Sequence, residues 1–143
     1  MTRLLLFLLL PLWSNLPTTS VSINLVSTAS AKGCVRVAIF SAPEDYQTGK
    51  SMSGWVTKLT GEPYPAQIGI PALPPGKYVI AAFHDLNENE KLDRNLFGVP
   101  VEPYGFVRTP QNKWRKPRWD EISFEVTDQT KAISVEMKRW KEY

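Results

Sequence analysis

The residues of this sequence that are best suited to chemistry lie in one polar stretch, residues 84–93. Side chains with oxygen atoms recur there at every second position, and one backbone carbonyl adds a further oxygen. A calcium ion takes six to eight oxygen ligands at about 2.3–2.6 Å, and a tight loop directs alternate side chains inward. The spacing therefore predicts a candidate calcium loop whose ligands are Asp85, Asn87, Asn89, the carbonyl of Lys91, and Asp93.

A second interpretation of the same stretch needs no metal. Glu90 occupies the position where the helix–loop–helix calcium pattern has Gly, and Leu96 the position where it has a bidentate Glu. Aspartate and asparagine side chains also accept hydrogen bonds from their own backbone in Asx turns. A hairpin loop held by such turns is therefore the alternative. His84, at the end of a predicted strand, is interpreted as a hydrogen-bonding residue at the rim.

Five basic residues alternate with two tryptophans over residues 108–119. Arginine and lysine bind phosphates or sulfates, while tryptophan stacks on a sugar or a base. The alternative is a solvated loop whose tryptophans fold back over the end of the domain and make cation–π contacts. The candidate contacts to a polyanion are Arg108, Lys113, Trp114, Arg115, Lys116, Arg118 and Trp119.

The sequence carries little that would support catalysis. Cys34 and His84 are the only pair that could form a thiol–imidazole couple, and no motif surrounds the cysteine. Gly-x-Ser-x-Gly, a metal-binding pair of histidines and a phosphate-binding glycine loop are all missing from the sequence. We therefore expect no enzyme, with an uncharacterised hydrolase as the lesser alternative, and no cofactor other than calcium.

The amino terminus has the pattern of an export signal. Arg3 precedes an apolar run, Leu4 to Leu12, which is too short to span a bilayer, and Ala29-Ser30-Ala31 provides small residues at a cleavage site. This predicts a signal peptide over residues 1–31 and a periplasmic or extracellular protein. No run elsewhere in the sequence is long and apolar enough for a transmembrane helix. Envelope polyanions or polysaccharides are then expected as partners, and nucleic acid is not.

The single cysteine, Cys34, excludes an internal disulfide. A cysteine just after a signal is lipidated in bacterial lipoproteins, but the preceding Ala31-Lys32-Gly33 does not fit the usual lipoprotein signal. Lipid anchoring is therefore not expected, and Cys34 is interpreted as a small buried residue that opens the first strand.

The remaining residues, 32–143, predict one domain with its own core. Their net charge is about +2, too small an excess to require a polyanionic partner. Apolar residues alternate with polar ones in several short segments, and no segment has a helical period. Residues 43–54 read as a loop. The predicted strands are 35–39, 55–59, 66–70, 78–83, 122–126 and 133–137, with a seventh proposed around 97–101.

These elements predict an all-β fold, an antiparallel β-sandwich of immunoglobulin or prealbumin type with about seven strands. Such a module suits a binding or structural role in the cell envelope rather than catalysis. An adhesion or assembly module stabilised by calcium in the 85–93 loop is the alternative.

Three motifs resemble a bacterial family of exported proteins known as domain of unknown function number 2141. The resemblance implies a β-sandwich similar to carboxypeptidase-regulatory-like and prealbumin-like modules, with no established activity or catalytic residue. This chain departs from the family pattern at Glu90, where glycine is usual, and in the basic insert. The motifs are Leu73-Pro74-Pro75-Gly76-Lys77-Tyr78, Phe83-His84-Asp85-x-Asn87-x-Asn89 and Phe97-Gly98-Val99-Pro100-x-Glu102-x-Tyr104-Gly105-Phe106.

Overall fold

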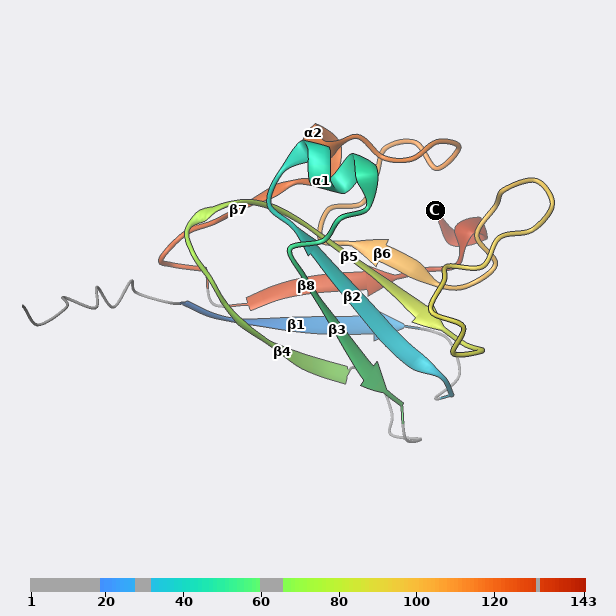
Figure 1. The fold of residues 1–143 in the computed structure, drawn as a ribbon, viewed down its shortest axis with the longest axis horizontal. Helices are drawn as coiled ribbons and strands as arrows, with labels where there is room; N and C mark the ends of the chain where they lie inside the picture. The colour runs from blue at the N-terminus through green and yellow to red at the C-terminus, as the bar shows by residue number, and fades with distance from the viewer. Residues whose placement is uncertain (1–18, 28–31, 60–65, 131) are drawn as a thin grey trace, which may run out of the picture.

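Two β-sheets pack face to face in the computed structural model, which describes residues 19–27, 32–59, 66–130 and 132–143 (Figure 1). The smaller sheet has the strand order β4 (Ala66–Leu73), β1 (Thr19–Ser27), β8 (Ala132–Met137). The larger sheet has the order β3 (Ser53–Lys58), β2 (Cys34–Phe40), β5 (Gly76–Asp85), β6 (Tyr104–Phe106). A further short strand, β7 (Phe124–Val126), pairs with the start of β5.

The main core lies between the two sheets. Successive side chains of a strand point to opposite faces, so every second residue of β2 and β5 faces this core. The smaller sheet contributes alternate residues of β4 and β8. The buried set comprises Val35, Val37, Ile39, Ile68, Ile70, Leu73, Tyr78, Ile80, Ala82, Val126, Ile133, Val135 and Met137.

A second apolar cluster covers part of the other face of the larger sheet. It joins Phe40 and Val79 to Tyr46 of helix α1 (Pro43–Thr48) and Ile122 of helix α2 (Trp119–Ile122). Helix α1 begins at Pro43, whose missing amide hydrogen costs nothing at the first helical position. It ends at Thr48, and the next residue, Gly49, adopts a φ of +76° that glycine accepts without strain.

The predicted all-β class is confirmed, since strands dominate the described residues and the predicted segments form strands at nearly the predicted places. Three expectations were wrong. Residues 97–101 form no strand, only an isolated bridge from Arg94 to Pro100, and the short strand β6 lies further on. Two short α-helices were not predicted: α1 falls in the segment read as a loop, and α2 begins at the end of the basic insert and overlaps the predicted strand 122–126 only at Ile122. The pairing of β1 with β8 is parallel, not antiparallel.

The structure also describes a strand upstream of the predicted start of the domain. Strand β1 lies upstream of Lys32, the predicted first residue of the domain, while the predicted cleavage motif at 29–31 lies outside the described residues. Cys34 opens β2 and is buried, as predicted. None of the helices among the described residues is long and apolar enough to cross a membrane.

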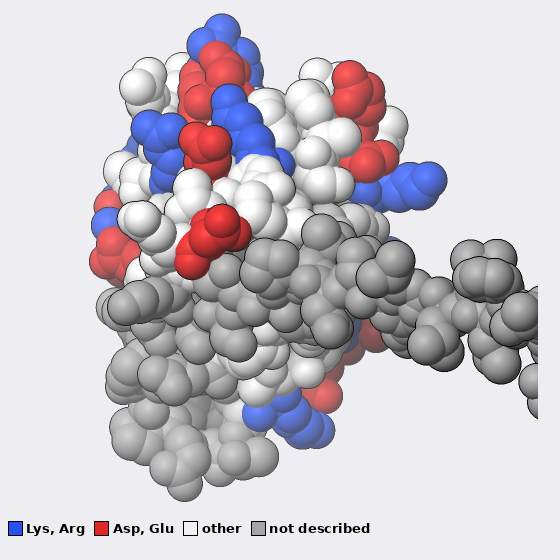
Figure 2. All heavy atoms as spheres, turned by 90° about the vertical axis from the view of Figure 1, so that its left-hand side faces the viewer, with Lys and Arg blue, Asp and Glu red and all other residues white. Residues whose placement is uncertain are grey.

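Charge is mixed on the end of the molecule that Figure 2 shows. Basic and acidic side chains are interspersed over the described part of that face. This agrees with the small net charge of +3 for the whole chain. Any charge-selective site must therefore come from local arrangement and not from a general excess of one sign.

Candidate functional site

A cleft of about 840 Å³ opens on the outer face of the larger sheet. Its floor is made by residues of β2, β5 and β6 that face away from the main core. Ala38 and Ala81 are opposite one another in the register of β2 and β5. Because both side chains are small, the floor is low there, and Phe83 and Phe106 stand beside it. A volume of this size accommodates a ligand of several rings.

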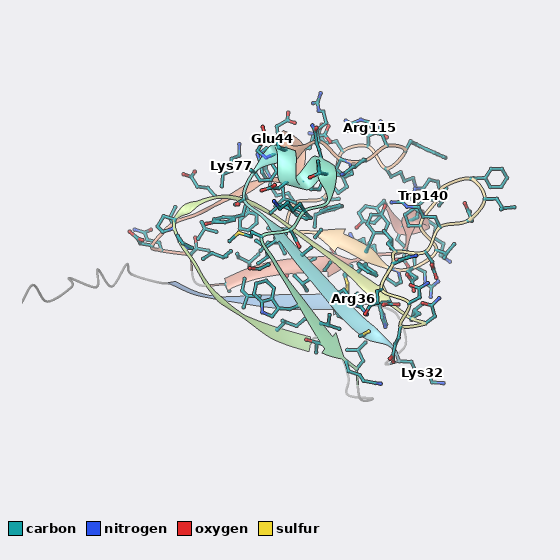
Figure 3. All side chains as sticks on the ribbon, viewed as in Figure 1. Lys32, Arg36, Glu44, Lys77, Arg115 and Trp140 are labelled. Carbon is teal, nitrogen blue, oxygen red and sulfur yellow. The ribbon has the colours of Figure 1, made fainter. Side chains whose placement is uncertain are left out.

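Residues of two long loops line the walls of the cleft, and Figure 1 shows the course of both loops. One is the loop after β5, residues 86–103, and the other is the part of the basic insert that precedes α2, residues 108–118. Figure 3 shows Arg115 on the insert and Trp140 between the two loops. The mouth carries strongly exposed aromatic rings, since Phe97 is 89% exposed and Trp114 is 76% exposed. Exposed apolar rings at the rim of a cleft are typical of binding surfaces.

Two buried carboxylates hold the first wall in place. Asp85 accepts hydrogen bonds from the amides of Asn89 (3.0 Å) and Glu90 (2.9 Å) and from Nε of Arg36 (2.7 Å). Burial by itself would raise the pKa of Asp85, but Arg36 and then these two amides outweigh it, and the pKa lies below 3.8.

The second buried carboxylate, Glu102, closes the base of the same loop. It accepts hydrogen bonds from the amides of Leu86 (2.8 Å) and Asp93 (3.0 Å). These bonds tie the beginning and the middle of the loop to its end. This role of Glu102 could not be predicted from the sequence, because a carboxylate sixteen residues from its partner Leu86 leaves no local pattern.

The candidate calcium loop is held by its own hydrogen bonds. The side-chain amides of Asn87 and Asn89 donate to the two oxygens of Asp93, at 2.7 and 2.9 Å. The amide of Asn89 also donates to Oδ1 of Asn87, and the amide of Lys91 to Oδ1 of Asn89. These are the Asx turns of the second interpretation. Among the described residues, no group of three or more His, Cys, Asp or Glu side chains is arranged to hold a metal ion.

Two glutamates of this loop adopt left-handed backbone conformations. Glu88 has a φ of 59° and Glu90 a φ of 69°, values that are costly for residues with a Cβ. Each makes an ion pair across to the sheet, Glu88 to Lys58 (3.5 Å) and Glu90 to Arg36 (3.2 Å). Glu90 is the position at which the family pattern has glycine, and its φ explains that preference.

The central part of the basic insert folds back on the domain. Nζ of Lys116 donates to the backbone carbonyls of Tyr46 (2.8 Å) and Gln47 (3.1 Å) and lies 4.5 Å from the centre of the Tyr46 ring. Nζ of Lys113 donates to a backbone oxygen of Tyr143 (2.7 Å) and lies 4.3 Å from the ring centre of Trp140. The cation–π contacts of the folded-back interpretation are therefore present.

The insert is also anchored to α2 by an ion pair. Arg115 binds both carboxylate oxygens of Glu121 in α2. The hydrogen bonds from Arg115, followed by that from the Arg118 amide, lower the pKa of Glu121 to about 2. Arg118 is paired with Asp120 at 3.5 Å on the surface.

The predicted polyanion contacts thus separate into two groups. Four of them line the cleft, namely Lys113, Trp114, Arg115 and Lys116. Arg118 is not among the lining residues, and Arg108 instead donates to the carbonyl of Ser123 (3.2 Å). Trp119 packs beside Tyr46, with ring centres 6.4 Å apart, and supports the second apolar cluster.

The cleft has a one-sided charge. Five basic residues line it, and none of the described lining residues is Asp or Glu. Arg36 and Arg115 form ion pairs with carboxylates that lie behind them. Nζ of Lys113 donates to the main-chain oxygen of Tyr143, the last residue of the sequence. For Arg94 and Lys116, the hydrogen bonds found among the described residues go to main-chain carbonyl oxygens, so no ion pair found there neutralises their positive charge.

Cys34 and His84 do not meet as a catalytic pair. Cys34 is opposite Asp85 in the register of β2 and β5, whereas His84 is opposite Val35. Adjacent positions along a strand face opposite sides of the sheet, so the thiol and the imidazole lie on different faces. Burial raises the pKa of the Cys34 thiol, which disfavours the thiolate. Nε2 of His84 lies 2.6 Å from the carbonyl oxygen of Lys32.

The fold and the cleft define a class: an all-β domain of two packed sheets whose long loops border a cleft. The chain belongs to the family described as "Uncharacterized protein conserved in bacteria (DUF2141)", whose sequence model matches residues 23–134. This confirms the resemblance seen in the motifs. No curated protein matches the chain. No solved structure matches it.

Proposed function

We propose that this protein is an exported, non-catalytic binding module that holds an acidic polysaccharide of the cell envelope in its cleft. The observation that carries the proposal is the lining itself, which combines aromatic rings with five basic residues and, among the described residues, no acidic one.

The aromatic part of the lining suits a sugar ring. Flat aromatic faces pack against apolar faces of a ligand while the polar edges remain in water. Trp114 packs edge-on against Trp140, with ring centres 4.7 Å apart, which fixes its orientation while most of its surface stays exposed. A rigid exposed ring binds at a low entropic cost, because little side-chain freedom is lost.

The basic part of the lining suits carboxylate or sulfate groups on that sugar. Arg94 is on the 86–103 loop and Lys113 on the insert, so positive charge comes from both walls. Charge-assisted hydrogen bonds to anions are stronger than neutral ones. A ligand with anionic groups spaced along a chain of rings can meet both walls at once.

The same lining supports binding over catalysis. Among its described residues there is no Asp, Glu, His, Cys, Ser or Thr, the side chains that most often serve as nucleophile or as general acid and base. Two tyrosines are present. Burial raises the pKa of Tyr46 to about 12 and also raises the pKa of Tyr104, so both remain protonated near neutral pH.

The proposal is tested by titrating the protein with heparin, polygalacturonate and neutral dextran while tryptophan fluorescence is recorded. We expect the two acidic polymers to bind and dextran to bind far more weakly. Trp114→Ala should weaken binding by about 5–150-fold, the range measured for stacking contacts. Arg94→Gln should weaken it by about 2–10-fold, and more at low salt than at high salt.

Arg118→Gln is the matched control, because it removes one positive charge from the insert at a residue outside the cleft lining. It should change the affinity less than twofold. Equal losses for Arg94→Gln and Arg118→Gln would show that general surface charge is responsible and would refute the cleft. Binding of none of the three polymers would refute the ligand class.

A further inference from the structure

The smaller sheet depends on a strand that lies within the predicted signal peptide. β1 is its middle strand, with β4 antiparallel on one side and β8 parallel on the other. Residues Ser22 to Leu25 pair on both sides at once. Ile23, for example, is opposite Ile68 in β4 and opposite Ile133 in β8, and both partners are buried. This segment is therefore part of the folded domain.

Cleavage after Ala31 would remove this strand. β4 and β8 would then be separated by two strand spacings, about 9.6 Å, with their backbone groups facing an empty position. Unpaired backbone N–H and C=O groups that are shielded from water are strongly unfavourable. The smaller sheet would keep two strands where the structure has three.

Three observations place the start of the domain near residue 21. The regular register of β1 with β4 begins at Val21, after an irregularity between Thr19 and Val21. The parallel pairing with β8 begins at Ser22. The family match begins at residue 23. In the sequence, apolar residues at 21, 23 and 25 alternate with polar ones, a period typical of a strand with one buried face.

A cleavage site stands at this boundary. Thr18-Thr19-Ser20 places small residues at the first and third positions before Val21, as signal peptidase requires. The leader would then have 20 residues, made of Arg3, the apolar run Leu4 to Leu12 and a short polar end. This length lies well within the usual range of about 15–30, whereas 31 residues lies beyond it.

We propose that the export signal is cleaved between Ser20 and Val21, so that residues 21–27, the regularly paired part of β1, form the amino-terminal strand of the mature domain. The inference rests on the export that the proposed function assumes. It replaces the cleavage after Ala31 that the small residues at 29–31 predict.

The direct test is intact-mass spectrometry of the full chain after export from a bacterial host. A start at Val21 is expected. Ser20→Arg should block this cleavage, because the site requires a small residue, while Ala31→Arg, the matched control, should leave the mature mass shifted only by the substitution. A start at Lys32, abolished by Ala31→Arg, would overturn the inference.

A second measurement examines the strand independently of export. In the full chain, Ile23→Pro removes a backbone donor from the middle of the smaller sheet and should lower the urea midpoint by about 1–3 M. Leu16→Pro, upstream of the strand, should leave it unchanged. An unchanged midpoint for Ile23→Pro would also overturn the inference.

The outcomes separate this inference from the proposed function. Cleavage at Lys32 would leave export and ligand binding intact and refute only the boundary. An uncleaved chain in the exported fraction would refute the boundary, and a chain found only in the cytoplasm of the host would refute export, while binding of acidic polysaccharide at the cleft is measured on its own.

Discussion

The ion pair at the base of the first wall offers a stringent test, through the substitution Asp85→Asn. The Asp85 side chain is 0% exposed and that of Arg36 is 19% exposed, so the pair is largely removed from water. An asparagine has the same shape but only one oxygen, whereas Asp85 uses both of its oxygens to accept three hydrogen bonds. In the variant, the side-chain NH2 group therefore faces one of these N–H donors, and no hydrogen bond can form between them.

The magnitude follows from these contacts. Breaking a buried ion pair by removing one partner costs about 3–5 kcal/mol. Here the arginine remains partly exposed and keeps its contact with Glu90 at 3.2 Å, which reduces the cost. We expect Asp85→Asn to lower the free energy of unfolding by about 2–4 kcal/mol. The loss is smaller than for a fully buried pair, because Glu90 and water still compensate part of the Arg36 charge. This corresponds to a melting temperature lower by roughly 8–16 °C.

The measurement is urea unfolding followed by circular dichroism, with Asp128→Asn as the control. Asp128 lies in the exposed turn after β7, where an Asp-to-Asn change should stay within about 0.5 kcal/mol. If Asp85→Asn were as mild as this control, the assignment of Asp85 as the group that holds the loop would be refuted.

The pH dependence of the same pair supplies a second readout. The pKa of Asp85 is lowered in the folded state, so its contribution is fully present above its unfolded value, near 3.8, and is lost as the pH falls through the folded pKa. The variant lacks this contribution at every pH. The difference in stability between parent and variant should therefore be constant from pH 7 to about 5 and shrink below about pH 4. A difference that grew on acidification would contradict the sign.

Three further outcomes are expected. Gly105→Ala should destabilise the domain by about 1–3 kcal/mol in urea unfolding, because a Cβ there would come within 2.9 Å of the carbonyl carbon of Glu136. Gly69→Ala is the control and should be neutral, since nothing lies within 4 Å of a Cβ at that position. Calcium up to about 10 mM should leave the melting temperature unchanged, because both carboxylate oxygens of Asp93 already accept hydrogen bonds. A rise of several degrees with calcium, abolished by Asp93→Asn, would instead establish the calcium-stabilised module. Glu90→Gly should be more stable than Glu90→Ala in urea, since both lose the ion pair but only glycine accepts a φ of 69° without strain, and the reverse order would contradict this account.

Much of the fold could be predicted because its signals are local. The alternation in residues 35–39 and 133–137 identified strands whose every second residue is buried in the structure. Strand β6, in contrast, has three residues, too few to show a period. Helix α1 has six, and its polar sequence is typical of a loop until Tyr46 packs against Phe40, with ring centres 5.4 Å apart.

Strand β1 was missed for a different reason. Its alternation spans only five residues and lies in a polar stretch that length and the small residues at 29–31 assigned to the signal. Its place is fixed by pairing with residues 66–73 and 132–137, and such long-range pairing leaves no mark on the segment itself. Only the register shows that the segment completes a sheet.

Half of the candidate site could be found in the same way. The insert was identified because basic residues and tryptophans are close together in the sequence, and Lys113, Trp114, Arg115 and Lys116 do line the cleft. The floor and the other wall could not be found. Ala38 and Ala81 are ordinary strand residues, and they become a floor only because β2 and β5 are paired in that register.

The way in which the walls are held says which interactions should dominate binding. Asp85 and Glu102 fix the first wall through backbone amides, and the cations of the second wall are largely engaged with carbonyl oxygens, a carboxylate and ring faces. Their hydrogen-bonding capacity is thus used to position the loops, while the Phe97 and Trp114 rings remain exposed between them. A surface positioned before binding loses little conformational entropy when a ligand arrives. We therefore expect loss of the Trp114 ring to weaken binding more than loss of the Arg94 charge, at every salt concentration. If loss of the Arg94 charge weakened binding more than loss of the Trp114 ring at physiological salt, charge and not ring stacking would dominate the affinity, and this argument would be refuted.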